Sequence, residues 1–449
     1  MKVFVYIPFF LLGFGVLGQD KEIQFSLLRQ NDDISALKFK EKKSVYEQVK
    51  WIPLGKNAEL SFGGSYRFQT EAFVNEQFNS EADQNDSWFL NRLMLHSHLK
   101  LSDNFQFFAE LNSSTINSKN NLSPVDKDEL SVNQLFATYN FTDSWSFLVG
   151  RQNLRLGSGR LVDVREGPNV RLSFDMAHLQ FQNNNISLSG FFAVPVQQQA
   201  GVFDNDFLSF TENLAGLYIT KNWSDTWNAD LYILRKREDG KTWNSGTADD
   251  NRTSLGVRYF GSWKGFRFNN EFVYQLGNFG EQDIRAWTVS FNVERSMQWL
   301  DTTINLGIKT EAISGDKDAN DNTLNTFDAL YPRGAYFGRV ARFGPSNLID
   351  IHPYIDTSIG AFYAALDYVA FWRFSTSDGV YGPPLVLDYP SLNNNRFIGH
   401  QIGTITGWNL NNHMTFELET NLIFPGSFLA ESGLGNTLFH TVLTLEFKY

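Results

Sequence analysis

Arginine is concentrated in one stretch of this 449-residue sequence. Five arginines fall within 21 residues, at Arg151, Arg155, Arg160, Arg165 and Arg171. The same stretch holds two acids, Asp163 and Glu166. A guanidinium group is planar and can pair bidentately with a carboxylate or a phosphate. The stretch therefore predicts an anion-binding segment.

Other residues that could take part in catalysis or metal binding form weaker patterns. Asp316, Asp318 and Asn320 alternate like the start of a calcium-binding loop, but the bidentate Glu expected downstream is missing. Gly157-Ser158-Gly159 lacks the spacing of a nucleophile elbow. The chain has no cysteine, which excludes thiolate metal sites and cysteine nucleophiles. We therefore expect no cofactor and no enzyme activity, with calcium as a weak candidate at Asp316, Asp318 and Asn320.

The composition indicates an aromatic-rich β protein. Phe, Trp and Tyr number 42, 11 and 16, whereas charged residues make up 19% of the chain. Beyond residue 18, no apolar run approaches the roughly 18 residues of a membrane helix. So many aromatic residues require burial or a lipid-facing surface, which argues against disorder. The net charge of −11 provides no basic surface for nucleic acid.

The beginning of the sequence resembles an export signal. Lys2 provides a short positive region, and Val3–Leu17 is nearly all apolar. Val16 and Gly18 are small residues at the positions that a signal peptidase reads. We therefore predict that residues 1–18 are a signal peptide.

From residue 58 onward, segments alternate apolar and polar side chains, the period of a β-strand with two unlike faces. In the final segment, one face carries Phe439, Leu443, Leu445, Phe447 and Tyr449, and the other His440, Thr444, Glu446 and Lys448. A tilted strand of about 9 to 11 residues crosses a bilayer. Because every backbone group in hydrocarbon must pair within the protein, a sheet can cross only as a closed barrel.

The connections between these segments alternate in length. Eight short connections, such as 102–104 and 264–265, separate nine longer ones that include 153–169, 238–251 and 313–346. This alternation gives eighteen strands, with short turns on one rim and long loops on the other, as in outer-membrane barrels. An even strand number places both termini on the short-turn side, the periplasmic side.

The predicted fold is thus all-β: a transmembrane antiparallel barrel of about eighteen strands with a polar lumen, over residues 58–449. Residues 19–57 are densely charged and are expected to form a periplasmic lead-in. A wide single-chain barrel closes its own edges, so we expect a monomer. Outer-membrane lipid and lipopolysaccharide are its expected surroundings.

The strand alternation also predicts which side chains face the lumen. Inward candidates include the basic residues Arg67, Arg92, Arg171 and Arg373. Over all strands, the basic and the acidic inward candidates are similar in number. Strand composition therefore leaves ion selectivity open. The arginine-rich stretch lies in a long loop, which either folds inward to line a constriction or remains outside to meet anionic lipopolysaccharide. The residues alone favour neither alternative.

Several short runs carry a family resemblance. They are Leu60–Arg67, Val149–Gln152, Arg171–Asp175, Ser314–Arg333 and Phe371–Tyr381, in this order along the chain. In these runs the sequence resembles the alginate export family of Gram-negative outer-membrane barrels, over roughly residues 58 to 449. The lead-in is similar to what precedes this domain in Bacteroidetes members.

The resemblance implies a monomeric barrel of eighteen strands whose arginine-lined constriction passes a polyanionic sugar chain. Residue by residue, it implies pathway roles for Arg67, Arg151, Arg155, Arg171, Arg333 and Arg373, with Asp175 fixing an arginine rotamer. Together with Arg92, Arg160 and Arg165, these are the candidate pore-lining residues.

The leading hypothesis is a channel for passive transport or export of a hydrophilic, anionic solute or an alginate-like polysaccharide, with a periplasmic delivery partner. One alternative is a surface adhesin or outer-membrane enzyme that uses the long loops and is anchored by the barrel. Another is a barrel that is plugged by its own lead-in and gated by a periplasmic partner.

Overall fold

The computed structural model describes residues 23–79, 85–224, 226–300 and 302–449. The signal peptide predicted for residues 1–18 lies outside the described residues.

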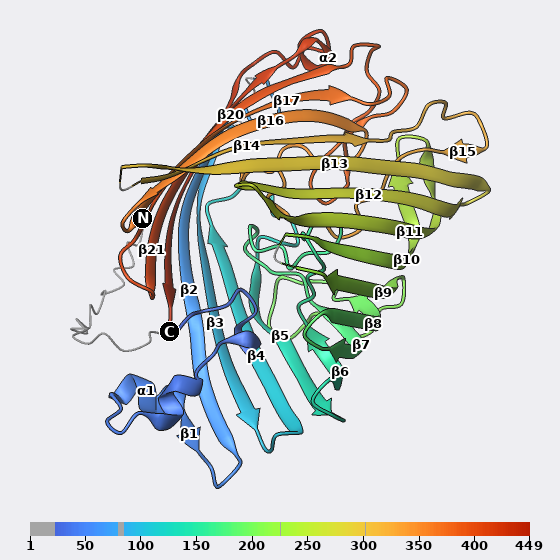
Figure 1. Cartoon of the computed structure of the whole chain (residues 1–449). Helices are drawn as coiled ribbons and strands as arrows, with labels where there is room; N and C mark the ends of the chain where they lie inside the picture. The colour runs from blue at the N-terminus through green and yellow to red at the C-terminus, as the bar shows by residue number, and fades with distance from the viewer. Residues whose placement is uncertain (1–22, 80–84, 225, 301) are drawn as a thin grey trace.

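Within the described residues, eighteen long strands form one closed antiparallel barrel (Figure 1). Its strands are β2 (Glu59–Val74), β3 (Asp86–Lys100), β4 (Phe105–Asn117), β5 (Asp128–Asn140), β6 (Trp145–Gln152), β7 (Phe174–Gln182), β8 (Ile186–Pro195), β9 (Glu212–Asn222), β10 (Asn228–Trp243), β11 (Gly246–Trp263), β12 (Phe266–Phe279), β13 (Gln282–Trp299), β14 (Thr302–Ile313), β16 (Leu348–Ile359), β17 (Phe362–Arg373), β20 (Phe397–Asn409), β21 (Met414–Pro425) and β22 (Leu438–Lys448). Each pairs with the next in this order, and β22 pairs with β2 to close the sheet. The predicted fold and strand number are confirmed.

The remaining elements are short. They are β1 (Ile52–Pro53), β15 (Thr323–Leu324), β18 (Val380–Tyr381), β19 (Leu387–Tyr389), the 3-10 helices η1 (Arg29–Asn31) and η2 (Ser35–Phe39), and the α-helices α1 (Val45–Lys50) and α2 (Ser427–Ala430). None of the helices among the described residues has the length and apolar character needed to cross a membrane.

The two faces of the wall differ as the alternation predicts. Leu217 of β9 and Leu231 of β10 are more than half exposed on the outer surface, at 53% and 56%. On the inner face, Arg92 of β3 and Gln275 of β12 are buried. An apolar outer surface of this kind is the lipid-facing band of a membrane barrel.

Aromatic side chains gather near the short turns. Trp227 stacks on Tyr259 with ring centroids 4.9 Å apart, and Phe268 lies 5.0 Å from Tyr259. Phe362 and Trp408 stack in the same way at 5.4 Å. Amphipathic rings favour the membrane–water interface, so these rings mark one interfacial girdle.

One predicted loop is wrong. The stretch 238–251 is not a long loop, because β10 and β11 continue through it and turn at Asn244–Ser245. A bulge between Glu238 and Lys241, with Gly240 at φ +67°, lets β10 extend beyond its last apolar positions. The polar composition that indicated a loop belongs to this strand extension.

The two faces lead to a stability prediction. Leu217 lies midway along β9, so Leu217→Arg places a charge on the lipid-facing surface near mid-membrane. We expect the free energy of unfolding in phospholipid vesicles to fall by about 2–4 kcal/mol. Asn184→Arg, in an exposed turn, is the control and should change the stability little. Equal effects of the two substitutions would contradict the assigned lipid face.

Candidate functional site in the barrel lumen

The connection between β6 and β7, residues 153–173, folds into the barrel, and we refer to it as the constriction loop. Arg67 of β2 donates from Nη1 to the carbonyl of Glu166 and from Nη2 to that of Pro168, both at 2.7 Å. The carboxylate of Glu166 forms ion pairs with Arg92 of β3 and with Arg171. Three guanidinium groups therefore surround one loop carboxylate on this side of the barrel.

Charge pairing keeps this carboxylate ionised. Burial alone would raise the pKa of the Glu166 carboxyl, but the guanidinium groups of Arg171, Arg92 and Arg67 lower its pKa well below the usual range. Arg67, Arg92 and Arg171 are themselves almost completely buried. Because these guanidinium groups are buried, their excess charge acts on the lumen mainly through its electrostatic field. They offer few exposed hydrogen-bond donors to a solute.

The other part of the constriction loop attaches across the barrel. Ser158 Oγ donates to Glu271 of β12 at 3.0 Å. Arg160 contacts Glu271 at 3.3 Å and Glu311 of β14 at 2.6 Å. The constriction loop therefore spans the lumen from the β2–β3 wall to the β12–β14 wall. Of the two arrangements open at the sequence level, the inward-folded one is observed.

A second loop, residues 314–347 between β14 and β16, folds inward beside the first. The two loops exchange backbone hydrogen bonds, from Asp163 N to Tyr331 O at 3.0 Å and from Tyr331 N to Leu161 O at 2.8 Å. Tyr336 donates its hydroxyl to Glu311 at 2.8 Å. Together the loops form one crosspiece inside the barrel.

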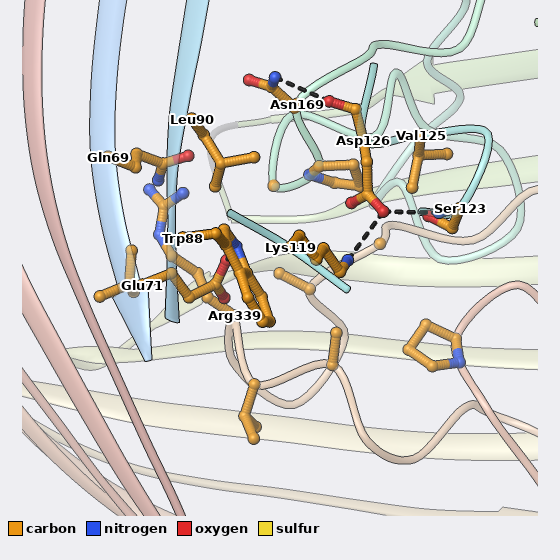
Figure 2. Close-up of a pocket in the computed structure, with 18 of the residues that line it drawn as sticks. Gln69, Glu71, Trp88, Leu90, Lys119, Ser123, Val125, Asp126, Asn169 and Arg339 are labelled. Atoms are coloured by element: carbon orange, nitrogen blue, oxygen red, sulfur yellow. Dashed lines mark hydrogen bonds and ion pairs between the residues drawn. The ribbon is translucent and has the colours of Figure 1, made fainter. Parts of the chain in front are cut away.

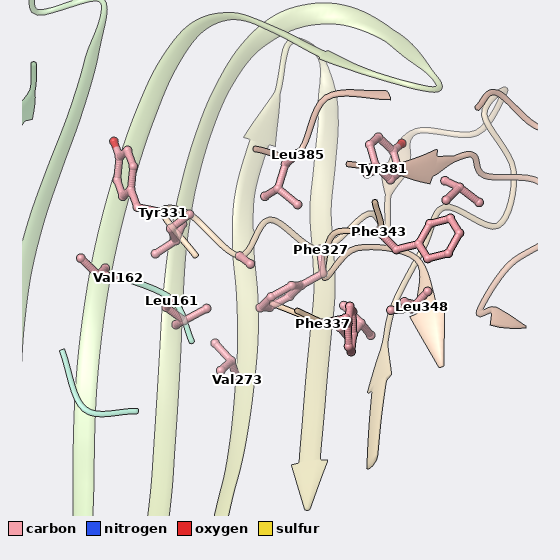
Figure 3. Close-up of a cluster of buried hydrophobic side chains, with 14 of the residues drawn as sticks. Leu161, Val162, Val273, Phe327, Tyr331, Phe337, Phe343, Leu348, Tyr381 and Leu385 are labelled. Atoms are coloured by element: carbon pink, nitrogen blue, oxygen red, sulfur yellow. The ribbon is translucent and has the colours of Figure 1, made fainter. Parts of the chain in front are cut away.

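The crosspiece has an apolar core of its own (Figure 3). Leu161 and Val162 of the constriction loop pack in one buried cluster with Phe327, Phe337 and Phe343 of the second loop. The lumen is thus polar along much of its wall, but its centre at this level is partly filled by hydrocarbon. Such packing makes the crosspiece a fixed part of the structure.

A cavity of about 270 Å³ lies between the crosspiece and the β2, β3 and β22 wall (Figure 2). Its charged lining residues are Glu71, Glu76, Lys119, Asp126, Arg165 and Arg339. Lys119 and Asp126 form an ion pair at 2.7 Å, which Figure 2 shows beside Trp88. Arg165 is only half-buried and donates from Nε to the carbonyl of Pro332 at 3.4 Å.

The other predicted pathway residues occupy different surroundings. Arg151 of β6 and Asp175 of β7 face each other in a bidentate pair at 2.8 and 2.9 Å. Arg155 lies 3.4 Å from Asp163, and 40% of its side chain is exposed. Arg333 donates to the carbonyl of Ser158 at 2.7 Å, so it joins the second loop to the first.

Arg373 lies apart from this group. Its guanidinium is fully buried and donates to the carbonyls of Thr376, Asp378 and Asn395 at 3.0 to 3.1 Å. These carbonyls belong to the connection 374–396, so Arg373 organises that loop. The structure does not bring it together with the arginines around Glu166.

The weak calcium candidates do not converge. Asp316 Oδ1 accepts from the amides of Lys317 and Asn325, and Asp318 Oδ1 accepts from the amide of Asn320. Asp316 is buried, whereas Asp318 and Asn320 are exposed. No group of three or more His, Asp or Glu side chains with metal-site geometry occurs in the described part of the chain.

Sequence reasoning missed three important residues. Glu166 was counted as an acid of the arginine-rich stretch, yet it is the group on which the arginines converge. Arg339 and Tyr336 fix the second loop to Glu417 and Glu311. The available signal was the excess of arginines over acids in this stretch, because a buried guanidinium needs a nearby anion.

The model of the family described as alginate export matches residues 58–437. The chain belongs to the alginate export family. Among curated proteins, none matches this sequence. The barrel of this alginate export family member is also similar to several solved structures.

Three structures illustrate this similarity. OccAB4 of Acinetobacter baumannii has a TM-score of 0.59 and 11% identity, over 88% of this chain and 99% of that one. OpdO of Pseudomonas aeruginosa has a TM-score of 0.55 and 12% identity, over 86% and 97%. A BenF-like porin from Pseudomonas fluorescens Pf-5 has a TM-score of 0.57 and 7% identity, over 87% and 98%. At these identities the similarity shows a shared porin-like fold. Family and fold together support an outer-membrane channel for passive transport.

Glu166 provides a test of how the constriction loop of this family member is anchored. In Glu166→Gln, three buried guanidinium groups lose their common carboxylate. We expect amide hydrogen exchange in residues 160–172 to accelerate by about ten-fold or more, because an unpaired buried charge costs ~1–3 kcal/mol of local stability. Hydrogen-exchange mass spectrometry on the folded barrel measures this.

Glu281→Gln, in an exposed turn, is the matched control. Unchanged exchange in Glu166→Gln would show that the apolar core alone holds the constriction loop in place.

Proposed function

We propose that this protein is an outer-membrane channel that passes a hydrophilic, anionic solute or an alginate-like polysaccharide by passive transport or export. The observation that carries the proposal is the convergence of Arg67, Arg92 and Arg171 on the single carboxylate of Glu166. Three positive charges against one negative charge leave a formal excess of two where the constriction loop meets the wall. Such an excess attracts anions into a confined lumen.

Acids elsewhere in the lumen offset part of this excess, because Glu446 lies opposite Arg67 across the β2–β22 pair and two arginines each serve two acids. Arg160 neutralises part of the charge of Glu271 and Glu311. Arg339 lies 3.2 Å from Glu417 and 3.6 Å from Glu419. The total charge of the lumen is therefore a poor guide to the field at the constriction.

Two further arginines are suited to direct contact with a solute. Arg165 lines the cavity and Arg333 links the two loops, and both are only half-buried. Neither guanidinium has a carboxylate within 4.0 Å among the ion pairs of the described residues. Each thus keeps donors for a carboxylate, the group that a polyuronate carries on every sugar.

The proposal includes the orientation and the surroundings of the barrel. The short turns would lie in the periplasm together with both ends of the barrel, and the long loops would face outward near lipopolysaccharide. One chain closes the wall, which supports a monomer. A periplasmic delivery partner would present the solute at the short-turn mouth.

The alternative of a loop-based adhesin or enzyme gains no comparable support. Two long connections, 153–173 and 314–347, are bound to the inner wall and to each other, which removes much of their surface from the outside. The arrangement of charges favours transport as the function.

Current block by a uronic-acid oligosaccharide tests the proposed function. In planar bilayers, an acidic oligomer should block the ion current more strongly than a neutral oligomer of equal length. In the double variant Arg165→Gln/Arg333→Gln, we expect the dissociation constant for block to rise about ten-fold or more, because a hydrogen bond to a charged group contributes ~1.5 kcal/mol or more.

Arg295→Gln is the matched control, since Arg295 is exposed on the outer face over the ring of Phe266. Equal block by acidic and neutral oligomers would overturn the anionic assignment. A wild-type barrel that carries no current would overturn the channel itself.

A further inference from the structure

Residues 23–57 lie against the barrel at the rim of short turns (Figure 1). They contain seven Lys or Arg and four Asp or Glu, whereas the whole chain has a net charge of −11. Leu37 is the one hydrophobic residue of this described segment that is fully buried. Phe39 and Val45, by contrast, are 83% and 77% exposed. Phe25, Leu27 and Tyr46 are among the residues that are half-buried, so apolar contact is partial, and specific polar contacts add to it.

The segment lies at the seam, where the barrel closes. The backbone pair between Gly64 and Tyr449 is the last link of β2 to β22, with both hydrogen bonds at 2.9 to 3.0 Å. The first residues of β2 extend beyond this link, which leaves one of their edges without a partner from β22. β1 occupies this edge, because Ile52 pairs with Leu60 and Pro53 with Glu59. A free strand edge is thereby covered.

Arg29 connects the two sides of the seam. Its Nη1 donates to the carbonyl of Gly64 on β2 at 2.9 Å, and its Nη2 donates to Tyr449 O at 3.1 Å. Its Nε is held by Asp32 at 2.9 Å, and the whole residue is buried. One guanidinium thus bonds both strands at the point where their own pairing ends. Charge-assisted hydrogen bonds of this kind are among the stronger polar contacts.

Lys50 forms a second attachment. A capping box between Ser44 and Glu47 defines the start of α1, and Lys50 is its last residue. The ammonium group lies over Gly63 on the inner face of β2, where an added Cβ would be only 2.3 Å from Nζ and 2.6 Å from the ring of His96. The glycine therefore leaves the space that the lysine fills.

The segment also reaches the constriction loop. Gln134 on the inner face of β5 donates to Gln30 at 3.4 Å, and its carbonyl oxygen accepts from the amide of Asn153 at 3.1 Å. Asn153 is the first residue of the constriction loop. One glutamine side chain thus connects the segment at the mouth with the loop that crosses the lumen.

We propose that residues 23–57 form a releasable strap, which clamps the barrel seam, narrows the short-turn mouth and supports the start of the constriction loop through Gln134. Docking by a few polar attachments and half-buried apolar side chains, with Leu37 as the one buried hydrophobic residue of the segment, allows release without unfolding of the barrel. The channel then has a strapped level of low conductance and an unstrapped level of higher conductance. This goes beyond the proposed function, because it is independent of the charge of the solute.

Single-channel recording on the full chain tests the strap with one substitution in the strap and one in the barrel strand that it contacts. Arg29→Gln removes the clamp, and Gly63→Ala fills the space for Lys50 without altering the strap. We expect both variants to spend at least ten-fold more time at the higher conductance level than the wild type. Lys42→Gln, an exposed lysine of the same segment, is the control and should behave like the wild type.

A reversible cross-link distinguishes release of the strap from poor folding of the variants. Because the chain contains no cysteine, Phe25→Cys/His413→Cys can be joined by a short bis-methanethiosulfonate, which links to each thiol through a reducible disulfide bond. The two native rings lie 5.2 Å apart, one on the strap and one on the turn between β20 and β21. Cross-linking should abolish the higher level, and reduction should restore it in the same channels.

Two outcomes would overturn the strap: folded Arg29→Gln and Gly63→Ala channels with wild-type current levels, or a cross-link without effect. Oligosaccharide block through Arg165 and Arg333 should persist when the strap is released. A loss of anionic block with normal strap behaviour would therefore contradict the proposed function alone.

Proton binding provides a second readout. Burial, and then the charge of Arg29, lower the pKa of Lys50 from 10.5 to about 8. The groups that face Lys50 are Arg29, Asp32 and Tyr46 of the strap and His96 of β3. The released strap binds the proton more tightly than the docked one, so docking strengthens as the pH rises from about 8 to 10. The fraction of time at the higher conductance level should fall over this pH range, and Lys50→Met should remove this dependence on pH.

Discussion

The barrel exists because one sheet closes on itself, and both the apolar exterior and the charged interior follow from this closure. In hydrocarbon, each backbone N–H and C=O must find a partner within the protein, and a sheet meets this requirement only when its first strand pairs with its last. β2 and β22 form that pair, from Ser65–Lys448 to Val74–Phe439. The wall thus separates an apolar exterior from an interior that must accommodate every inward-facing charge.

Inside the barrel, charged side chains of the loops pair with the charged side chains of the wall. The guanidinium groups of β2 and β3 face Glu166, and the carboxylates of β12 and β14 face Arg160. A buried charge is costly unless it is paired, so each pair also fixes the position of the loop that provides it. The crosspiece is consequently held at both walls, and its apolar core fills the space between the attachments.

The wall was predictable from the sequence because its signal is local. The alternation in Phe439–Tyr449 follows from the pleat of a strand, and short turns recur at a spacing that the membrane thickness sets. The interior was less predictable, because its contacts join residues that are far apart in the sequence. Nothing near Glu166 indicates that Arg67, 99 residues earlier, binds its carbonyl. Arg373 is a case of the opposite kind. The prediction that it faces inward is correct, but its guanidinium donates to loop carbonyls and is not available to a solute.

The proposed transport requires a pathway through this barrel that is wet and electropositive at the constriction loop. The reversal potential of the wild-type channel in a salt gradient measures this property, because its sign reports which ion crosses more easily. We expect a potential on the anion side, which moves towards zero as ionic strength screens the arginines. A potential on the cation side, or the absence of any current, would contradict it.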